Sequence, residues 1–319
     1  DCSRSLEPAA EPAMPMGGLL DGPLLPVAVA LVFIGAAAFI FLRDQSGDLR
    51  SMLAAAPSPA NSLKTARAIA RMYGDQLAQC IDYGLKQPRL RLHQGQRDGC
   101  AAQLSKLAKL GPSDTQLAHS LERMLDDVLA LTALVADAGL LRKTAFSSQD
   151  PGHEEALELL WGTLQPSRLR QGGRISKDWG DIGFQGVDPA TDFRGMGYLS
   201  LLNLLNLAQH RPAFCEQHIR TYMQPGNELT YFPFAITSIN VTGWALDLLA
   251  EGACDAAILD GRGINVDAIH AIHYALFRHF VHTWQTERPA SVMEFGRVQS
   301  KALADVKRMG VEKLLSLYN

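Results

Sequence analysis

Residues 179–204 read Trp-Gly-Asp-Ile-Gly-Phe-Gln-Gly-Val-Asp-Pro-Ala-Thr-Asp-Phe-Arg-Gly-Met-Gly-Tyr-Leu-Ser-Leu-Leu-Asn-Leu. Glycine occupies five of these positions, and glycine permits backbone conformations and close backbone approaches that other residues do not allow. Three large apolar side chains lie among these glycines and can anchor the segment to a hydrophobic core, namely Trp179, Phe184 and Phe193. The stretch therefore predicts a loop that is pinned to the rest of the protein.

The second half of the stretch has the features of a helix start. Asp188-Pro189 and Thr191-Asp192 are residue pairs typical of helix N-termini, and a leucine-rich series begins at Leu199. Arg194 would then lie near a helix N-terminus, where the helix dipole disfavours a cation. The residues alone favour a structural role, in which Arg194 pairs with Asp192 or with backbone carbonyl groups.

The same stretch resembles the ELMO (engulfment and motility) domain, whose signature has the form Trp-x3-Gly-Phe-Gln-x3-Pro-x-Thr-Asp-Phe-Arg-Gly-x-Gly-x-Leu-Gly-Leu-x2-Leu. Nearly every fixed position is met, and the departure is Ser200, where the family usually has glycine. Segments 160–161, 231–235 and 240–242 also look like family sequence, so the resemblance covers roughly residues 150–319. The residues that form or support the motif are Trp179, Gly183, Phe184, Gln185, Asp188, Pro189, Thr191, Asp192, Phe193, Arg194, Gly195 and Gly197.

The resemblance implies an all-helical fold and one of two lines of function. Short ELMO-domain proteins activate GTP hydrolysis by Arf and Arf-like GTPases, whereas larger ones are scaffolds for Rac exchange factors. Because the chain ends at Asn319, soon after the domain, we expect the short branch. That branch implies that Arg194 acts in trans as an arginine finger on GTP and magnesium held by the partner, so we expect no cofactor in this chain.

Two alternatives stay open for this site. The chain could be a non-catalytic adaptor that binds a small GTPase or an exchange factor at a membrane, and the sequence leaves its status as an enzyme open. Gln185 could orient a water molecule, as glutamines do in GTP hydrolysis, or it could be a turn residue that bonds to the backbone.

Three other patterns have weaker functional interpretations. Two histidine pairs, His270 with His273 and His279 with His282, could each present metal ligands on one helix face, but packing or solvated histidines are commoner, and we expect no metal site. The segment 195–200 approaches a dinucleotide fingerprint but lacks its third glycine. A basic loop precedes the motif and contains Arg168, Arg170, Arg174 and Lys177. We interpret it as a solvated loop, and the alternative is contact with an acidic partner or a lipid headgroup.

Outside the motif, three- and four-residue spacing of apolar side chains predicts helices, and no alternating run requires a sheet. The fold class is therefore all-α, a multi-helix ELMO-type domain preceded by a helical extension. The spacing predicts helices at 66–81, 117–135, 211–223, 232–250, 266–286 and 292–317.

Residues 24–42 contain no charged or strongly polar side chain and would extend about 28 Å as a helix, so we predict a single membrane span there. Basic residues follow this segment more densely than they precede it, which predicts that the ELMO domain faces the cytosol, with the endoplasmic reticulum and the Golgi as candidate organelles. The expected division is a tail at 1–23, the span at 24–42, a linker at 43–62, a helical extension at 63–149 and the ELMO domain at 150–319.

The composition limits the classes of partner. Thirty basic and thirty-three acidic residues give a net charge of −3, so we expect no nucleic-acid partner. Five widely spaced cysteines fit neither a disulfide framework nor a zinc module. The expected partners are thus an Arf-family GTPase and, through residues 24–42, a membrane.

Overall fold

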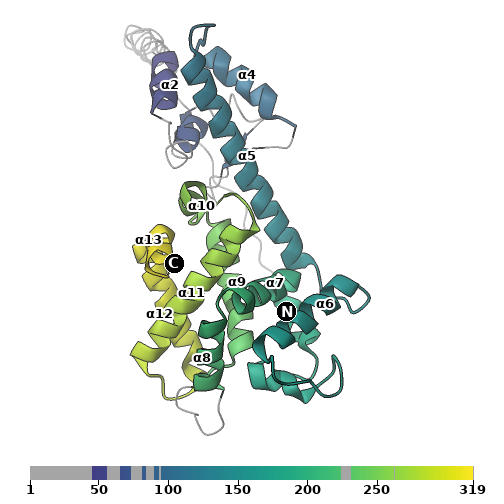
Figure 1. Ribbon diagram of the computed structural model, residues 1–319. Coiled ribbons are helices and arrows are strands. Elements are labelled where there is room, and N and C mark those ends of the chain that lie inside the picture. Colours follow the sequence, from purple (N-terminus) through teal and green to yellow (C-terminus); the bar gives the residue numbers. More distant parts are fainter. Residues whose placement is uncertain are drawn as a thin grey trace, which may run out of the picture. The chain divides into compact units, whose positions relative to one another are not determined.

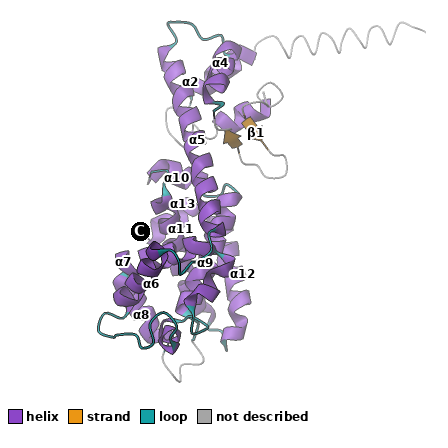
Figure 2. Ribbon diagram, turned by 90° about the vertical axis from the view of Figure 1, so that its right-hand side faces the viewer, coloured by secondary structure: helices purple, strands orange, loops and turns teal. Residues whose placement is uncertain are grey.

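The computed structural model describes residues 45–55, 65–72, 81–83, 90–92, 95–223, 231–261 and 263–318. Among these residues, helix is the predominant structure, as the all-α prediction requires (Figure 2). The predicted tail and membrane span, 1–23 and 24–42, lie outside the described residues. In the described part, no helix is both long enough and apolar enough to cross a bilayer.

Along the chain, the helices and strands begin with α2 (Gln45–Ala54) near the start of the described residues and finish with α13 (Val311–Tyr318). Between these two, in chain order, lie a helical segment at 65–72, β1 (Ile81–Tyr83), β2 (Leu90–Leu92), α4 (Arg97–Leu107), α5 (Thr115–Lys143), α6 (Pro151–Leu164), the 3₁₀ helices η1 (Lys177–Ile182) and η2 (Pro189–Gly195), α7 (Gly197–His210), α8 (Pro212–Tyr222), α9 (Phe234–Ala250), α10 (Asp255–Gly261), α11 (Val266–Glu287), the 3₁₀ helix η3 (Val292–Glu294) and α12 (Phe295–Met309).

Helix α5 is the long helix between α4 and α6 in Figure 1. It contributes to two clusters of buried apolar side chains. Its first half places Leu121 and Met124 in the smaller cluster, with α2, the segment 65–72 and α4. Its second half places Leu131 and Leu134 in the larger cluster, with the helices that follow. The predicted three- and four-residue spacing in α5 is confirmed, because one stripe of this helix serves both clusters.

Helices α7, α9 and α11 pack against one another in the larger cluster. Helix α9 is buried over most of its surface, including the polar side chains of Thr237, Ser238 and Thr242. Thr242 donates to the carbonyl oxygen of Ser238 and accepts from the amide of Asn203, so its hydroxyl group is satisfied inside the core. The motif residues that precede α7 are thereby attached to the most buried part of the fold.

Two expected helices differ from the structure. Ile81, predicted at the end of a helix at 66–81, lies in β1 and pairs with Leu92 of β2, because strand pairing with a later segment leaves no signal in local spacing. The expected helix at 292–317 is divided into η3, α12 and α13. The backbone at Gly310 has a φ of +87°, which a continuous α-helix cannot accommodate.

Candidate functional site

The motif folds as two 3₁₀ helices joined by a short loop and followed directly by α7. Ser176 caps η1 by accepting a hydrogen bond from the backbone N–H of Asp178. Asp188 caps η2 by accepting one from Ala190, with Pro189 in the first turn. The prediction that Asp188-Pro189 begins a helix is confirmed, although the helix is of the 3₁₀ type.

Two motif glycines are required by close backbone approaches. Gly183 has a φ of +89°, and a Cβ at this position would lie 2.9 Å from the backbone nitrogen of Ala235 in α9. Gly197 has a φ of +58°, and its Cβ would lie 2.7 Å from the carbonyl oxygen of Leu141, with the oxygen of Arg142 closer still. Real Cβ atoms essentially never approach other atoms within 3.0 Å, so both positions exclude a side chain.

A row of aromatic rings lies beneath the motif. The centroids of Trp161 and Trp179 are 5.3 Å apart, those of Trp179 and Phe184 are 5.5 Å apart, and those of Phe184 and Phe193 are 5.6 Å apart. Each of these three pairs is edge-to-face, an arrangement in which the quadrupoles of the two rings attract each other. Phe146 stacks on Phe193 and extends the row. The interpretation of Trp179, Phe184 and Phe193 as core anchors is confirmed, because each is at most 4% exposed.

Asp192 connects η2 to the loop before it. Its carboxylate accepts a hydrogen bond of 3.0 Å from the backbone N–H of Gln185, and the backbone N–H of Gly186 also donates to it. Burial raises the pKa of Asp192 above its ordinary value, while these hydrogen bonds and the positive charge of Arg194 oppose the shift. The main role of this carboxylate in the fold is therefore to hold the 185–186 backbone.

Arg194 lies on the surface, with its side chain exposed. Its Nε donates a hydrogen bond of 2.8 Å to the carbonyl oxygen of Thr191, which orients the guanidinium group. No carboxylate in the described part of the chain forms an ion pair with it, and the Asp192 carboxylate is engaged by the 185–186 backbone instead. Of the two structural alternatives for Arg194, the ion pair with Asp192 is absent among the described residues, whereas the hydrogen bond to a backbone carbonyl group is present through Nε. The terminal Nη1 and Nη2 groups make no hydrogen bond to a described residue.

Asp192 also brings Gln185 and Arg194 to one stretch of surface. Gln185 is exposed, and its side-chain amide makes no hydrogen bond to another described residue. Gly195 is exposed as well, and a Cβ there would meet no atom within 4 Å. Unlike Gly183 and Gly197, Gly195 is therefore not required by the packing of this chain.

Three of the four basic residues in the loop before the motif form ion pairs with carboxylates of neighbouring segments, which the interpretation as a solvated loop did not anticipate. Arg168 pairs with Asp178 and Asp181, and Arg174 pairs with Glu154 and Asp188. The side chain of Arg170 is only 4% exposed, pairs with Glu158 and lies 4.2 Å above the Trp179 ring. Acidic residues on both sides of this loop in the sequence were the signal for the pairing. Through these ion pairs and the contact with the Trp179 ring, the three arginines attach the loop to the motif.

The departure from the family pattern at Ser200 is accommodated inside the fold. Ser200 is fully buried in α7, and its hydroxyl group donates a hydrogen bond of 2.7 Å to the carbonyl oxygen of Gly197. The dinucleotide interpretation of segment 195–200 has no structural support in this region, because the segment follows the 3₁₀ helix η2 and not a strand.

The two residues of the first histidine pair, His270 and His273, contact different partners. His270 Nδ1 lies 2.6 Å from the amide oxygen of Asn203, whereas His273 Nε2 lies 3.0 Å from the carbonyl oxygen of Ser238. Burial lowers the pKa of His273 to about 4, so this ring is neutral at physiological pH. Within the described residues, no group of three or more histidine, cysteine or acidic side chains is arranged to hold a metal ion.

Replacing Asp192 tests whether its carboxylate holds the loop. Asp192→Ala leaves the N–H groups of Gln185 and Gly186 without their acceptor, so we expect the free energy of unfolding to fall by about 1–3 kcal/mol. Urea denaturation of the full chain measures this change. The matched control is Asp181→Ala, which breaks a more exposed pair with Arg168 and should cost less than about 1 kcal/mol. Equal losses in the two variants would contradict the role assigned to Asp192.

Comparison with known proteins gives one family. The family model described as ELMO/CED-12 family matches residues 139–299, from the end of α5 into α12. ELMO domain-containing protein 1 from Bos taurus is 34% identical over 218 residues, which cover 62% of this chain and 66% of the bovine protein, slightly less than two thirds of it.

Two further relatives have similar levels of identity. ELMO domain-containing protein 1 from Homo sapiens is 33% identical over 245 residues, covering 68% of this chain and 72% of that protein. ELMO domain-containing protein B from Dictyostelium discoideum is 35% identical over 161 residues, covering 50% of this chain and 54% of that protein. No solved structure matches the chain.

Proposed function

Because the chain belongs to the ELMO/CED-12 family, we propose that it is a membrane-anchored regulator of Arf or Arf-like small GTPases that supplies Arg194 to the partner's nucleotide site. The observation that carries this proposal is the state of Arg194, whose side chain is exposed and makes no ion pair with the described residues. Residues 24–42 provide the membrane anchor, and the helical domain faces the cytosol, at the endoplasmic reticulum or the Golgi.

The geometry of Arg194 suits contact with a phosphate group. A guanidinium group presents several N–H donors in a planar fork, which matches the oxygens of a phosphoryl group. The bond from Nε to Thr191 uses one donor to set the direction of the side chain and leaves both terminal nitrogens for a ligand. Such an arginine stabilises the charge that develops on the transferred phosphoryl group, and GTP and magnesium are then bound by the partner.

The surrounding surface supports docking of a protein. Gly195 adds no side chain beside Arg194, so another backbone can approach closely there. Val187, in the same loop as Gln185, is 44% exposed and adds apolar area to that loop. Gln185 is the second candidate group, positioned to orient water or to bond to the partner. These features equally support the second candidate function, a non-catalytic adaptor that docks a small GTPase or an exchange factor at the same surface.

Single-turnover GTP hydrolysis distinguishes the two functions. The full chain is added to a panel of Arf-family GTPases loaded with GTP, and the rate of phosphate release is compared with that of each GTPase alone. We expect at least one member to be accelerated by about 10³-fold or more, the range typical of an arginine supplied in trans. Binding of a loaded GTPase without acceleration would instead favour the adaptor, and absence of both binding and acceleration across the panel would exclude this partner class.

A further inference from the structure

A surface pocket of about 270 Å³ lies between α8, α11 and the end of α13, away from the motif in the chain. No aspartate or glutamate is among the described residues that line it. The residues that matter for its chemistry are Phe214, Gln217, His218, Arg278, His282 and Tyr318. The pocket therefore contains one side chain that is always positively charged, Arg278, together with neutral side chains and two histidines.

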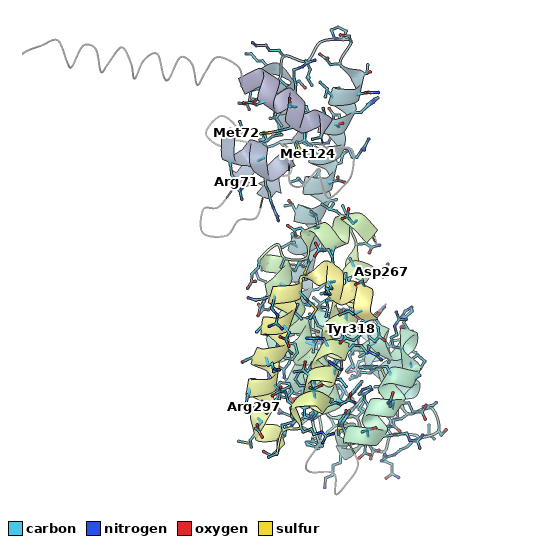
Figure 3. All side chains as sticks on the ribbon, turned by 90° about the vertical axis from the view of Figure 1, so that its left-hand side faces the viewer. Arg71, Met72, Met124, Asp267, Arg297 and Tyr318 are labelled. Carbon is cyan, nitrogen blue, oxygen red and sulfur yellow. The ribbon has the colours of Figure 1, made fainter. Side chains whose placement is uncertain are left out.

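The guanidinium group of Arg278 lies near two aromatic rings. Its Cζ lies 5.6 Å from the centroid of Phe214 and 5.6 Å from that of Tyr318, the α13 residue labelled in Figure 3. Cation–π contacts with both rings attract the group and restrict its position. The N–H donors of a guanidinium group lie along the edge of its plane, and those of Arg278 make no hydrogen bond to a described residue.

Arg278 has no counter-ion within the part of the chain that the structure describes. It is half-buried, yet it forms neither an ion pair nor a hydrogen bond with a described residue. Arg297 on α12, also labelled in Figure 3, shows the usual alternative, because it pairs with both Glu287 and Glu294. A half-buried cation without a counter-ion is costly in free energy, and binding of an anion would remove that cost.

His218 supplies a complementary acceptor. Its Nδ1 contacts the carbonyl oxygen of Phe214, and a carbonyl oxygen can only accept, so Nδ1 carries the proton. Burial lowers the pKa of His218, the hydrogen bond to Phe214 opposes this shift, and the charge of Arg278 adds to it, so the net effect favours the neutral ring. Nε2 is then an acceptor, which can receive a hydrogen bond from a protonated oxygen of a ligand.

We propose that this pocket binds a phosphate group, with phosphate oxygens on the guanidinium edge of Arg278 and a protonated phosphate oxygen donating to His218. Phosphate fits better than a carboxylate, because a singly protonated phosphate provides both charged acceptor oxygens and an O–H donor. The volume accommodates the phosphate and a small substituent. The phosphate could come from a lipid headgroup or from a free small molecule, and the chemistry of recognition is the same.

Isothermal titration of the full chain tests the site with three probes, namely inorganic phosphate, glycerol phosphate and a short-chain phosphatidic acid. We expect phosphate binding that weakens by about tenfold or more in Arg278→Gln, because the substitution removes the charge and the fork. Arg297→Gln is the matched control and should leave binding unchanged. Tighter binding of the phosphatidic acid than of the other two probes would assign the site to a lipid headgroup, and similar binding of all three to a free phosphate.

A second measurement keeps the test independent of the folding of the variants. Addition of inorganic phosphate to the unsubstituted chain should shift the nuclear magnetic resonance signals of the His218 ring, whereas sulfate, which has no proton to donate near neutral pH, should bind more weakly. Absence of phosphate binding, or equal loss of binding in Arg278→Gln and Arg297→Gln, would overturn the proposal. This site does not depend on the role proposed for Arg194, because different helices form it.

Discussion

Arg194→Lys is expected to reduce the stimulation of GTP hydrolysis by about 10³- to 10⁵-fold, which corresponds to about 4–7 kcal/mol in the activation barrier. Lysine retains one positive charge but loses the planar fork that can contact two phosphate oxygens at once. It also loses the Nε donor that binds the carbonyl oxygen of Thr191, so the charge would no longer be held in one direction. The rate of single-turnover hydrolysis with the most strongly stimulated GTPase is the direct measurement.

The same substitution should leave the fold intact. Arg194 is exposed and forms no ion pair with the described residues, so its replacement leaves no buried charge without a partner. We expect the free energy of unfolding to change by less than about 1 kcal/mol, measured on the preparation used for kinetics. Arg220→Lys is a suitable control, because Arg220 is an exposed arginine in a surface pair with Glu216. A folded Arg194→Lys chain that stimulates hydrolysis like the parent would eliminate the finger mechanism and favour the adaptor.

Gly197→Ala is expected to lower the free energy of unfolding by about 3 kcal/mol or more. The new Cβ would overlap backbone atoms at the end of α5, namely the carbonyl groups of Leu141 and Arg142, and backbone atoms cannot move aside as the end of a flexible side chain can. The φ of +58° adds the strain of a left-handed backbone in a residue with a side chain. Both effects arise where Gly197, the first residue of α7, contacts the end of α5.

Gly195→Ala is the matched control for this prediction. It lies two positions earlier, is exposed, and has neither a positive φ nor any atom within 4 Å of the new Cβ. Its free energy of unfolding should change by less than about 0.5 kcal/mol. Thermal or urea denaturation of the two variants compares them directly. Similar stability of Gly197→Ala and Gly195→Ala would show that the close approach of α7 to α5 is not required.

Much of the helical architecture could be predicted from local sequence. The spacing of apolar residues in α5, the helix start at Asp188-Pro189, and the large rings at Trp179, Phe184 and Phe193 each predicted what the structure shows. These signals are readable because helix period, proline geometry and side-chain size act on neighbouring residues. The strand at Ile81 and the break at Gly310 were missed, because pairing with a later segment and a single glycine with a positive φ leave the local spacing of apolar residues unchanged.

The sequence by itself determined the family, the helical class and the position of the arginine within a glycine-rich, aromatic-anchored motif, since all of these depend on residue identity and spacing. Only the tertiary structure decided which groups meet. It directs the Asp192 carboxylate to the 185–186 backbone instead of Arg194, and it pairs the loop arginines with acidic residues from several segments. It also places Arg278 near two rings from different helices. The physical reason is that hydrogen bonds and ion pairs extend only a few ångströms through space, whereas their partners are separated by any distance along the chain.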